Sequence, residues 1–208
     1  IDAARTALVV VDMQNYYMAE GYPNPAPVAQ AIVPNVNRMA AALRAAGGRV
    51  VWIQTDSREA PAKWSNHQKY KLTPERAEAR LRLLSDSNDG FKLYPSLEAK
   101  PEDLYVRKIM FSAMLPYSGD LDRVLRQHGV EILLIAGTKT NVCCESTARD
   151  ASMMNYRVAM LSDANATSTD EEHAAALNGF QVSFGDVMTV GEAITRLVPA
   201  AKRSAAAS

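Results

Sequence analysis

The sequence predicts an α/β fold in which a parallel sheet lies between two layers of helices. Apolar runs without alternation, such as residues 6–11 and 132–136, are typical of strands that are buried on both faces. These runs alternate along the chain with segments of helical spacing, which is the pattern of βαβ units with right-handed crossovers. The prediction is therefore a three-layer α-β-α arrangement.

Six segments are predicted as strands, and they are residues 6–11, 49–55, 104–108, 131–136, 156–162 and 186–189. The helices are expected between them, placed by their apolar spacing, by capping residues and by glycines that end them. The predicted helices run from 33 to the glycines at 47–48, from 73 or 74 to 84, from 120 to 128, from 143 to about 155, from 169 to 178, and from 191 to 198.

One long segment does not follow this alternation. Residues 56–101 are too many for a plain connection, so we expect an insertion near the functional site; a surface flap without a role is the alternative. Loops are expected at 21–27, which holds three prolines and a glycine, and at 110–118. We expect one domain over residues 1–199 and a disordered tail at 200–208.

The composition argues against a nucleic-acid or membrane partner. Hydrophobic residues make up 48 % and charged residues 22 % of the 208 residues, and 23 lysines and arginines balance 23 aspartates and glutamates. No apolar run approaches the roughly 18 residues that span a bilayer.

The only two cysteines are adjacent and cannot form an ordinary disulfide, so a reducing, cytoplasmic compartment is expected. No signal peptide is visible, but the chain begins at Ile1 rather than at a methionine, which leaves a missing upstream segment open.

A cysteine is predicted in the first turn of a helix, directly after a strand. Gly137 is expected to break the apolar run 132–136, and Thr140 and Asn141 are good N-cap residues before Cys143. Unpaired N–H groups and the helix dipole at such a position favour a thiolate and can hold an oxyanion. The alternative is that the two cysteines pack as small hydrophobic residues.

Three reactive side chains are predicted at the carboxyl ends of separate strands. Asp12 follows the strand 6–11, Lys108 ends the strand 104–108, and Cys143 follows the strand 131–136. Ligands of parallel sheets bind at this edge, so the combination predicts a functional site. Taken singly, Asp12 could be a turn residue and Lys108 a solvated strand end.

This combination suits acyl transfer from an amide through a thioester. Asp12 can take the proton of Cys143 and return it to a leaving amine, while Lys108 holds Asp12 ionised and adds positive potential. Asp56 with His67 is too sparse for a metal site, and the sequence has no glycine-rich phosphate loop. The predicted chemistry therefore needs no metal or cofactor.

Three blocks surround these residues. They are Ala-Leu-Val-Val-Val-Asp-Met-Gln-Asn around Asp12, Tyr-Val-Arg-Lys before Phe-Ser-Ala around Lys108, and Gly-Thr-Lys-Thr-Asn-Val-Cys ending at Cys143. Together they resemble the isochorismatase-like cysteine hydrolases, over nearly the whole chain. The resemblance implies a six-stranded, Rossmann-like parallel sheet and an Asp12–Lys108–Cys143 triad. It also implies a cis peptide bond between Lys139 and Thr140, beside an oxyanion site that includes the N–H of Cys143.

Within that family the chain looks most like the ureidoacrylate amidohydrolases, and it lacks the aspartate and spaced histidines that hold a metal in nicotinamidases. It departs from the family pattern at Lys139, where a small or apolar residue is usual, and at Cys144, where valine is usual. The expected function is hydrolysis of a C–N bond in a small amide or ureide. An isochorismatase-type vinyl-ether hydrolase and a non-catalytic interaction module are the alternatives.

Aromatic and polar residues near the predicted site are candidates for its wall, although a core or surface role is equally open for each. The substrate-binding candidates are Tyr17, Tyr22, Trp64, Asn66, Phe111 and Tyr117. The expected partner is a small molecule. We also expect a homodimer or homotetramer, with apolar surface near Tyr117 and at Met153 and Met154.

Overall fold

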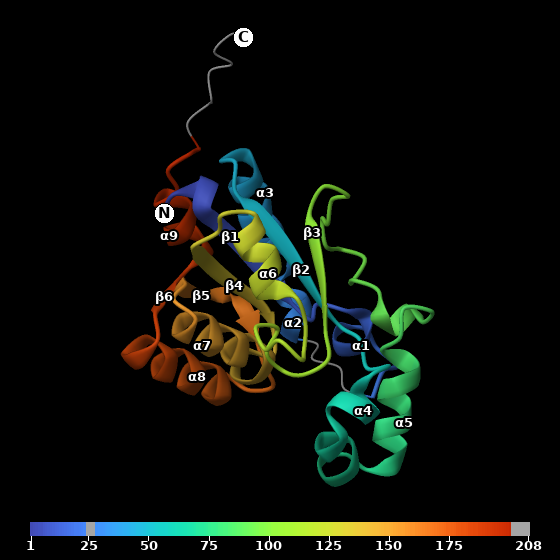
Figure 1. Ribbon diagram of the computed structural model, residues 1–208. Helices are drawn as coiled ribbons and strands as arrows, with labels where there is room; N and C mark the ends of the chain where they lie inside the picture. The colour runs from blue at the N-terminus through green and yellow to red at the C-terminus, as the bar shows by residue number, and fades with distance from the viewer. Residues whose placement is uncertain (24–27, 201–208) are drawn as a thin grey trace.

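The computed structural model of the protein describes residues 1–23 and 28–200. Its centre is a six-stranded sheet in which all neighbouring strands are parallel, in the order β3-β2-β1-β4-β5-β6 (Figure 1). The strands are β1 (Thr6–Val11), β2 (Arg49–Thr55), β3 (Leu104–Lys108), β4 (Ile132–Thr138), β5 (Arg157–Ala166) and β6 (Asp186–Met188). The predicted α/β class and its parallel sheet are confirmed.

Helices of very different length connect these strands. The α-helices are α1 (Asn15–Met18), α2 (Val28–Ala31), α3 (Val33–Ala45), α4 (Ala60–Lys63), α5 (Pro74–Leu83), α6 (Leu121–Gln127), α7 (Glu145–Met153), α8 (Asp170–Ser183) and α9 (Val190–Thr195). Two π-helices, η2 (His67–Lys71) and η4 (Thr140–Cys144), and two short 3-10 turns, η1 (Ala3–Arg5) and η3 (Asp89–Phe91), complete the set. The π-helix η2 contains His67, and the π-helix η4 contains Cys143.

The central strand β1 shows why the fold has three layers. Its side chains are buried on both faces, with Leu8 and Val10 in one core together with α3 and α9. Ala7, Val9 and Val11 lie in a second core with α6, α7 and α8. Burying one such side chain stabilises the fold by about 1.5–3 kcal/mol. The continuous apolar run is therefore explained by helices on both sides of the sheet.

Gly137 does not end strand β4, contrary to the prediction. The strand continues to Thr138, because Gly137 pairs with Val11 of β1 and Thr138 pairs with Ala166 of β5. Gly137 has a φ of +119°, and a Cβ at this position would overlap the carbonyl oxygen of Val11. Glycine is required here because the two strands approach closely, and it does not mark the end of a strand.

Two further elements are longer than the sequence pattern predicts. Strand β5 continues to Ala166 because the side-chain amide of Asn165 donates to the carbonyl oxygens of Ile135 (2.8 Å) and Leu161 (2.7 Å) and so bridges a register shift. Helix α8 continues to Ser183 because Phe180 is fully buried in the core beyond the predicted end. Tertiary contacts outweigh local pattern in both places.

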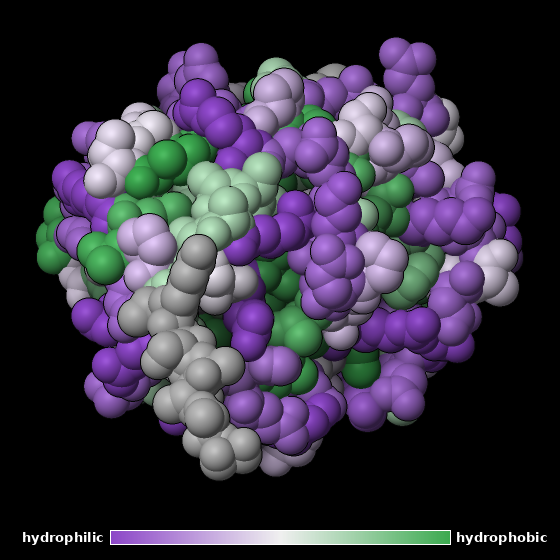
Figure 2. All heavy atoms as spheres, turned by 90° about the horizontal axis from the view of Figure 1, so that it is seen from above, coloured by the Kyte–Doolittle hydropathy of each residue, from purple (hydrophilic) through white to green (hydrophobic). Residues whose placement is uncertain are grey.

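The face of the molecule shown in Figure 2 is mostly hydrophilic, with hydrophobic residues in small separate areas. Tyr117 and Met153 are 77 % and 70 % exposed, whereas Met154 is half-buried against the core. The homodimer or homotetramer therefore stays a prediction, as does the one-domain interpretation of residues 1–199. Among the described residues, no helix has the length and apolar character needed to cross a membrane. Part of the predicted loop at 21–27 and nearly all of the predicted tail at 200–208 lie outside the described residues.

Candidate active site

The carboxyl ends of β1, β3 and β4 bring Asp12, Lys108 and Cys143 together. The Lys108 amine lies 2.7 Å from a carboxylate oxygen of Asp12 and 3.5 Å from the sulfur of Cys143. It also donates to the carbonyl oxygen of Met110 at 3.1 Å. The ammonium group therefore stands between the carboxylate and the thiol.

Thr55 is a member of this cluster that the sequence argument missed. Strand β2 lies between β1 and β3, and Thr55 at its end pairs in register with Lys108. Its hydroxyl donates to Asp12 at 2.9 Å and accepts from the Lys108 amine at 2.9 Å. The signal was present in the sequence, because Thr55 is the polar residue that ends a predicted strand at the same sheet edge.

The charges of this cluster are almost wholly removed from solvent. Asp12 and Lys108 are each 1 % exposed. Burial opposes the charge of Lys108, but the Asp12 carboxylate, the Cys143 sulfur and Tyr17 more than offset this and raise the pKa of the lysine. A buried pair of this kind depends on both partners, and removing one leaves an uncompensated charge.

The surroundings of Cys143 raise the pKa of its thiol, contrary to the expectation that they favour a thiolate. Cys143 is 8 % exposed. Burial raises the pKa of its thiol to about 12; the Asp12 carboxylate adds to this increase, while the Lys108 ammonium opposes it. The loss of solvation and the neighbouring carboxylate outweigh Lys108, so an ionised thiol requires that its proton move to a nearby base.

The turn between β4 and Cys143 also differs from the expectation. The cis peptide bond joins Thr138 and Lys139, not Lys139 and Thr140, and it lies directly after the end of β4. The carbonyl oxygen of Lys139 accepts from the N–H groups of Val142 (3.1 Å) and Cys144 (3.2 Å). These two N–H groups are therefore engaged inside the turn, whereas the amine of Lys139 reaches out to Ser168 at 3.1 Å.

His173 is a second residue that the sequence argument missed. Its Nε2 lies 3.0 Å from the carbonyl oxygen of Ser162, and its Nδ1 lies 2.9 Å from the hydroxyl of Thr140. A carbonyl oxygen only accepts, so Nε2 donates to it, and Nδ1 pairs with the hydroxyl of Thr140. This bridge from α8 holds Thr140, which is fully buried in η4. No motif marked His173 in the predicted helix.

The neighbouring Cys144 points away from the cluster. It is fully buried, and its sulfur lies 3.9 Å from the carbonyl oxygen of Ala136 on β4. It belongs to the apolar core beneath α7, together with Ala148 and Ala151. Its surroundings are those of a core valine.

The aromatic candidates lie in two different environments. Tyr17 is buried, and its hydroxyl lies 3.5 Å from the guanidinium of Arg80 on α5. Tyr22 is half-buried and packs edge-on against Tyr16, with ring centroids 6.2 Å apart. Tyr17 belongs to α1, and Tyr22 belongs to the segment after it.

The other candidates belong to the segment 56–101 and the loop after β3. Trp64 stacks on His67 at a centroid distance of 3.8 Å, and Phe111 meets Trp64 edge-on at 4.8 Å. Asn66 and Tyr117 are exposed. The structure therefore brings Trp64 and Phe111 together with His67, but it does not place Asn66 or Tyr117 in this cluster.

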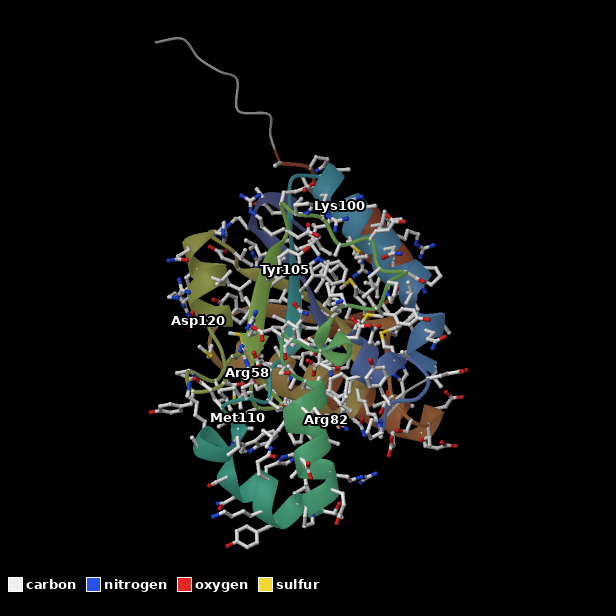
Figure 3. All side chains as sticks on the ribbon, turned by 90° about the vertical axis from the view of Figure 1, so that its right-hand side faces the viewer. Arg58, Arg82, Lys100, Tyr105, Met110 and Asp120 are labelled. Carbon is white, nitrogen blue, oxygen red and sulfur yellow. The ribbon has the colours of Figure 1, made fainter. Side chains whose placement is uncertain are left out.

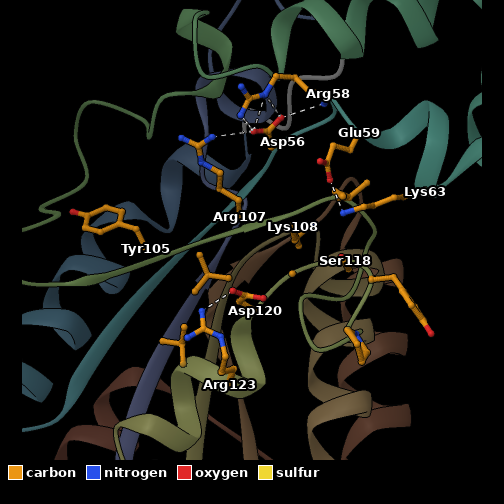
Figure 4. Close-up of a pocket in the computed structure, with 16 residues that line it drawn as sticks. Asp56, Arg58, Glu59, Lys63, Tyr105, Arg107, Lys108, Ser118, Asp120 and Arg123 are labelled. Atoms are coloured by element: carbon orange, nitrogen blue, oxygen red, sulfur yellow. Dashed lines mark hydrogen bonds and ion pairs between the residues drawn. The ribbon is translucent and has the colours of Figure 1, made fainter.

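A large surface cavity of about 640 Å³ lies on the outer side of the edge strand β3 (Figure 4). Its lining includes Lys108, but the amine of that residue is buried against Asp12. Its other charges are paired with one another, as for Arg123 with Asp120 at 2.6 Å. The carboxylate of Asp56 binds Arg58 at 2.6 Å and Arg107 at 3.2 Å. The cavity is therefore next to the reactive groups and not their substrate pocket.

The donor set does not fit a metal ion. Within residues 1–23 and 28–200 no group of three or more histidine, cysteine, aspartate or glutamate side chains could hold one. Asp56 is engaged by two arginines, and burial, which alone would raise its pKa, is outweighed by Arg58 and Arg107, which lower it. No step of the mechanism below involves a metal.

Comparison with known proteins shows which family and which relatives this chain is similar to. The isochorismatase domain model matches residues 6–192. The chain is 32 % identical to the ureidoacrylate amidohydrolase RutB of Pseudomonas savastanoi pv. phaseolicola, over 96 % of this chain and 86 % of that protein. A crystal structure of a cysteine hydrolase from Pseudomonas syringae pv. phaseolicola is 28 % identical with a TM-score of 0.83, covering 94 % of this chain and 93 % of that one. A pyrazinamidase of Pyrococcus horikoshii in complex with zinc is 25 % identical with a TM-score of 0.75, covering 89 % of this chain and 99 % of that one.

The chain therefore belongs to the isochorismatase family. It is a hydrolase of that family with the strand ends of its sheet gathered around Asp12, Lys108 and Cys143.

Proposed function

We propose that the protein is a cysteine-dependent amidohydrolase that cleaves a C–N bond of a small amide or ureide through a thioester. The observation that carries this proposal is the position of the Lys108 ammonium between the Asp12 carboxylate (2.7 Å) and the Cys143 sulfur (3.5 Å). The similarity to a ureidoacrylate amidohydrolase favours a substrate of the ureide type.

The first half of the reaction uses the thiol and the carboxylate together. Asp12 takes the proton of Cys143, and the sulfur attacks the substrate carbonyl to form the S–C bond of a tetrahedral intermediate. The N–H of Cys143 and one N–H from the preceding turn hold the oxyanion. Asp12 then protonates the leaving nitrogen, the C–N bond breaks, and the acyl group remains on Cys143.

The second half repeats these roles with water. Asp12 takes a proton from water, which attacks the thioester carbonyl, and the S–C bond breaks to release the acid. The proton returns to the Cys143 sulfur. Each proton that leaves one group is received by another, so the cycle ends with the enzyme unchanged.

The raised pKa of the resting thiol fits this sequence of steps. Burial and the Asp12 carboxylate raise the pKa of Cys143 to about 12. Transfer of the proton to Asp12 removes the repelling charge and leaves Lys108 beside the new thiolate. We expect the thiolate to form together with the protonation of Asp12.

A vinyl-ether hydrolase of the isochorismatase type is the second candidate. In that reaction Asp12 would protonate the substrate, and the cysteine would not be essential. The contact between Lys108 and the Cys143 sulfur favours the amidohydrolase, because an ether hydrolase has no use for it.

The test is a panel of small amides, ureides and vinyl ethers, assayed with and without EDTA for ammonia or acid release and, for the ethers, for the carbonyl product. We expect turnover of amides or ureides that is insensitive to EDTA. Intact-protein mass spectrometry at low pH or short times should show an acyl adduct on Cys143. Turnover of vinyl ethers alone, or activity that zinc restores after EDTA, would contradict the proposal. The cytoplasmic location stays a prediction.

A further inference from the structure

Strand β5 contains a bulge where it runs beside the end of β4. Ile135 of β4 pairs with Met160 of β5, and the next pair is Gly137 with Asn165. Residues 161–164 of β5 therefore stand opposite a single residue of β4. A bulge leaves backbone groups of the longer strand without their partners in the sheet, so these groups need other donors.

Helices on both faces of the sheet supply donors to this bulge. Asn35 on α3 donates from its side-chain amide to the carbonyl oxygen of Asp163 at 2.7 Å. His173, in the first turn of α8, donates from Nε2 to the carbonyl oxygen of Ser162 at 3.0 Å. The two contacts are alike in kind. They differ in position, because α3 packs on one face of the sheet, whereas α8 packs on the other face together with α7, the helix that follows Cys143.

Three consecutive residues of the turn before Cys143 contact the junction between β5 and α8. The contacts are, in chain order, Lys139 with Ser168 (3.1 Å), Thr140 with His173 (2.9 Å) and Asn141 with Thr167 (2.7 Å). Of these three contacts, only the central one continues to the bulge, because the ring of His173 binds Ser162 through its other nitrogen. The buried hydroxyl of Thr140 is thereby joined to the backbone of β5 through one side chain.

Thr140 leads directly into the nucleophile. It begins the π-helix η4, which also contains Cys143, and its carbonyl oxygen accepts from the N–H of Glu145 at the start of α7. Asp12 and Lys108 come from other strands, so a movement of Thr140 would displace Cys143 and the nearby N–H groups relative to them. A misplacement of about 1 Å can lower the rate of an enzyme roughly 10²-fold.

We propose that His173 is a positioning residue for the reaction: by joining Thr140 to the bulge of β5, it holds the turn that carries Cys143 in its working position. Both ring nitrogens of His173 are engaged by the protein, so its role is support and not contact with the substrate. This inference rests on the proposed function. It adds a support from α8, which lies across the molecule from α4 and α5 in Figure 1; Arg82 on α5 is on the side that faces the viewer in Figure 3.

Two substitutions of His173 separate its two contacts. The amide of asparagine ends close to the position of Nδ1, and that of glutamine reaches the position of Nε2, so His173→Asn keeps a partner for Thr140 and His173→Gln keeps a donor for Ser162. We expect His173→Gln to lower kcat on an amide or ureide by about 10–100-fold with KM within about threefold, because the turn and not substrate binding is disturbed. His173→Asn should keep kcat within about threefold of the wild type.

Asn35→Ala is the matched control, because it removes the same kind of contact to the bulge from the other face of the sheet. It should leave kcat unchanged. Thr140→Val removes the hydroxyl and should reproduce the loss in His173→Gln, and the double variant should be no slower than either single variant, because both remove the same contact. Urea denaturation checks that each variant is folded, and Thr140→Val carries the same test should His173→Gln not fold.

Alkylation of Cys143 by iodoacetamide tests the same support without turnover. In a Cys144→Val background, His173→Gln should raise the rate of alkylation by about 3–10-fold, because a loosened turn exposes a thiol that is only 8 % exposed in the folded protein. Asn35→Ala should not change this rate. A lower kcat combined with faster alkylation is not expected from a general loss of stability, which Asn35→Ala would share.

The positioning role would be overturned if Asn35→Ala matched His173→Gln in both measurements, or if His173→Gln kept the wild-type kcat while His173→Asn lost it. It would also be overturned if the losses in His173→Gln and Thr140→Val multiplied in the double variant. Failure of the proposed function looks different. In that case the wild-type protein would hydrolyse no amide or ureide, yet His173→Gln would still speed the alkylation of Cys143 and Asn35→Ala would not.

Discussion

The two regions that form the site differ in how their polar groups are satisfied. At the sheet edge the Lys108 amine has four partners, namely Asp12, Thr55, Met110 and Cys143. In the segment 56–101, by contrast, His67, Gln68 and Arg80 keep buried polar atoms without partners. The Lys108 amine thus finds its partners within the folded chain, whereas His67, Gln68 and Arg80 keep buried polar atoms that the described residues do not pair.

The origin of this difference is the backbone that carries each region. The reactive residues end strands that are held in register by their neighbours, such as Thr55 against Lys108. The segment 56–101 lies outside the sheet and is built from a four-residue helix, a π-helix and α5. A rigid frame suits groups that must stay within reach of one another, and a segment outside the sheet suits recognition, which varies with the substrate.

The largest effect is expected from Cys143→Ala. The nucleophile is lost, so kcat should fall by roughly 10⁴-fold or more. Stability in urea should fall only modestly, because the substitution removes a single buried sulfur atom. Ammonia release and denaturation curves measure the two quantities. Retention of activity by this variant, with loss only in an Asp12 variant, would favour the ether hydrolase.

Asp12→Asn should lower both the rate of catalysis and the stability of the fold. An amide cannot carry the proton, so kcat should fall by about 10²–10⁴-fold. The variant also leaves Lys108 buried without its counter-charge, which should cost about 3–5 kcal/mol of stability.

A double-mutant cycle with Lys108→Met isolates the contribution of the pair. The double variant should be less destabilised than the sum of the single variants, because it buries neither charge alone. Additivity within about 0.5 kcal/mol would show that the two side chains do not interact.

The pH dependence of alkylation should report the protonated resting thiol. In a Cys144→Val background, the rate at which iodoacetamide modifies Cys143 should rise about tenfold per pH unit from pH 7 to 9 without levelling, because burial and Asp12 raise the pKa of the thiol to about 12. Asp12→Asn should increase the rate at a given pH. A plateau below pH 8 would mean that Lys108 and the helix start outweigh burial.

The same shift has a consequence for stability. The folded thiol has a pKa above its ordinary value of 9.0, so the folded chain binds more protons than the unfolded chain between pH 9 and about 12. Its contribution is therefore fully present below pH 9 and is lost as the pH rises towards 12. Cys143→Ala should flatten this part of the stability curve.

The smallest effect is expected from Cys144→Val. Valine has a similar apolar volume and suits the core beneath α7, so kcat should stay within about twofold and stability within about 1.5 kcal/mol. Steady-state kinetics beside the wild type measure this. If Cys144→Val abolished activity and Cys143→Ala did not, the assignment of the nucleophile would be wrong.

The sequence by itself determined the strands and the edge at which the reactive groups meet. The segments 6–11, 49–55 and 104–108 match β1, β2 and β3 residue for residue. The apolar runs of β1 and β2 suit the interior of a parallel sheet, whereas the burial of the edge strand β3 alternates. Asp12, Lys108 and Cys143 follow from the same pattern, since each lies where such a run ends.

Only the tertiary structure decided which groups satisfy one another. Thr55 lies 53 residues from Lys108, and Arg80 lies 63 residues from Tyr17, so no local period links either pair. The raised pKa of the Cys143 thiol was decided in the same way, because its burial and its closeness to Asp12 exist only once the sheet is assembled. A sequence pattern predicts the face and the edge of the sheet on which a side chain lies. The groups that the side chain contacts, and its exposure to solvent, depend on distances that exist only in the folded protein.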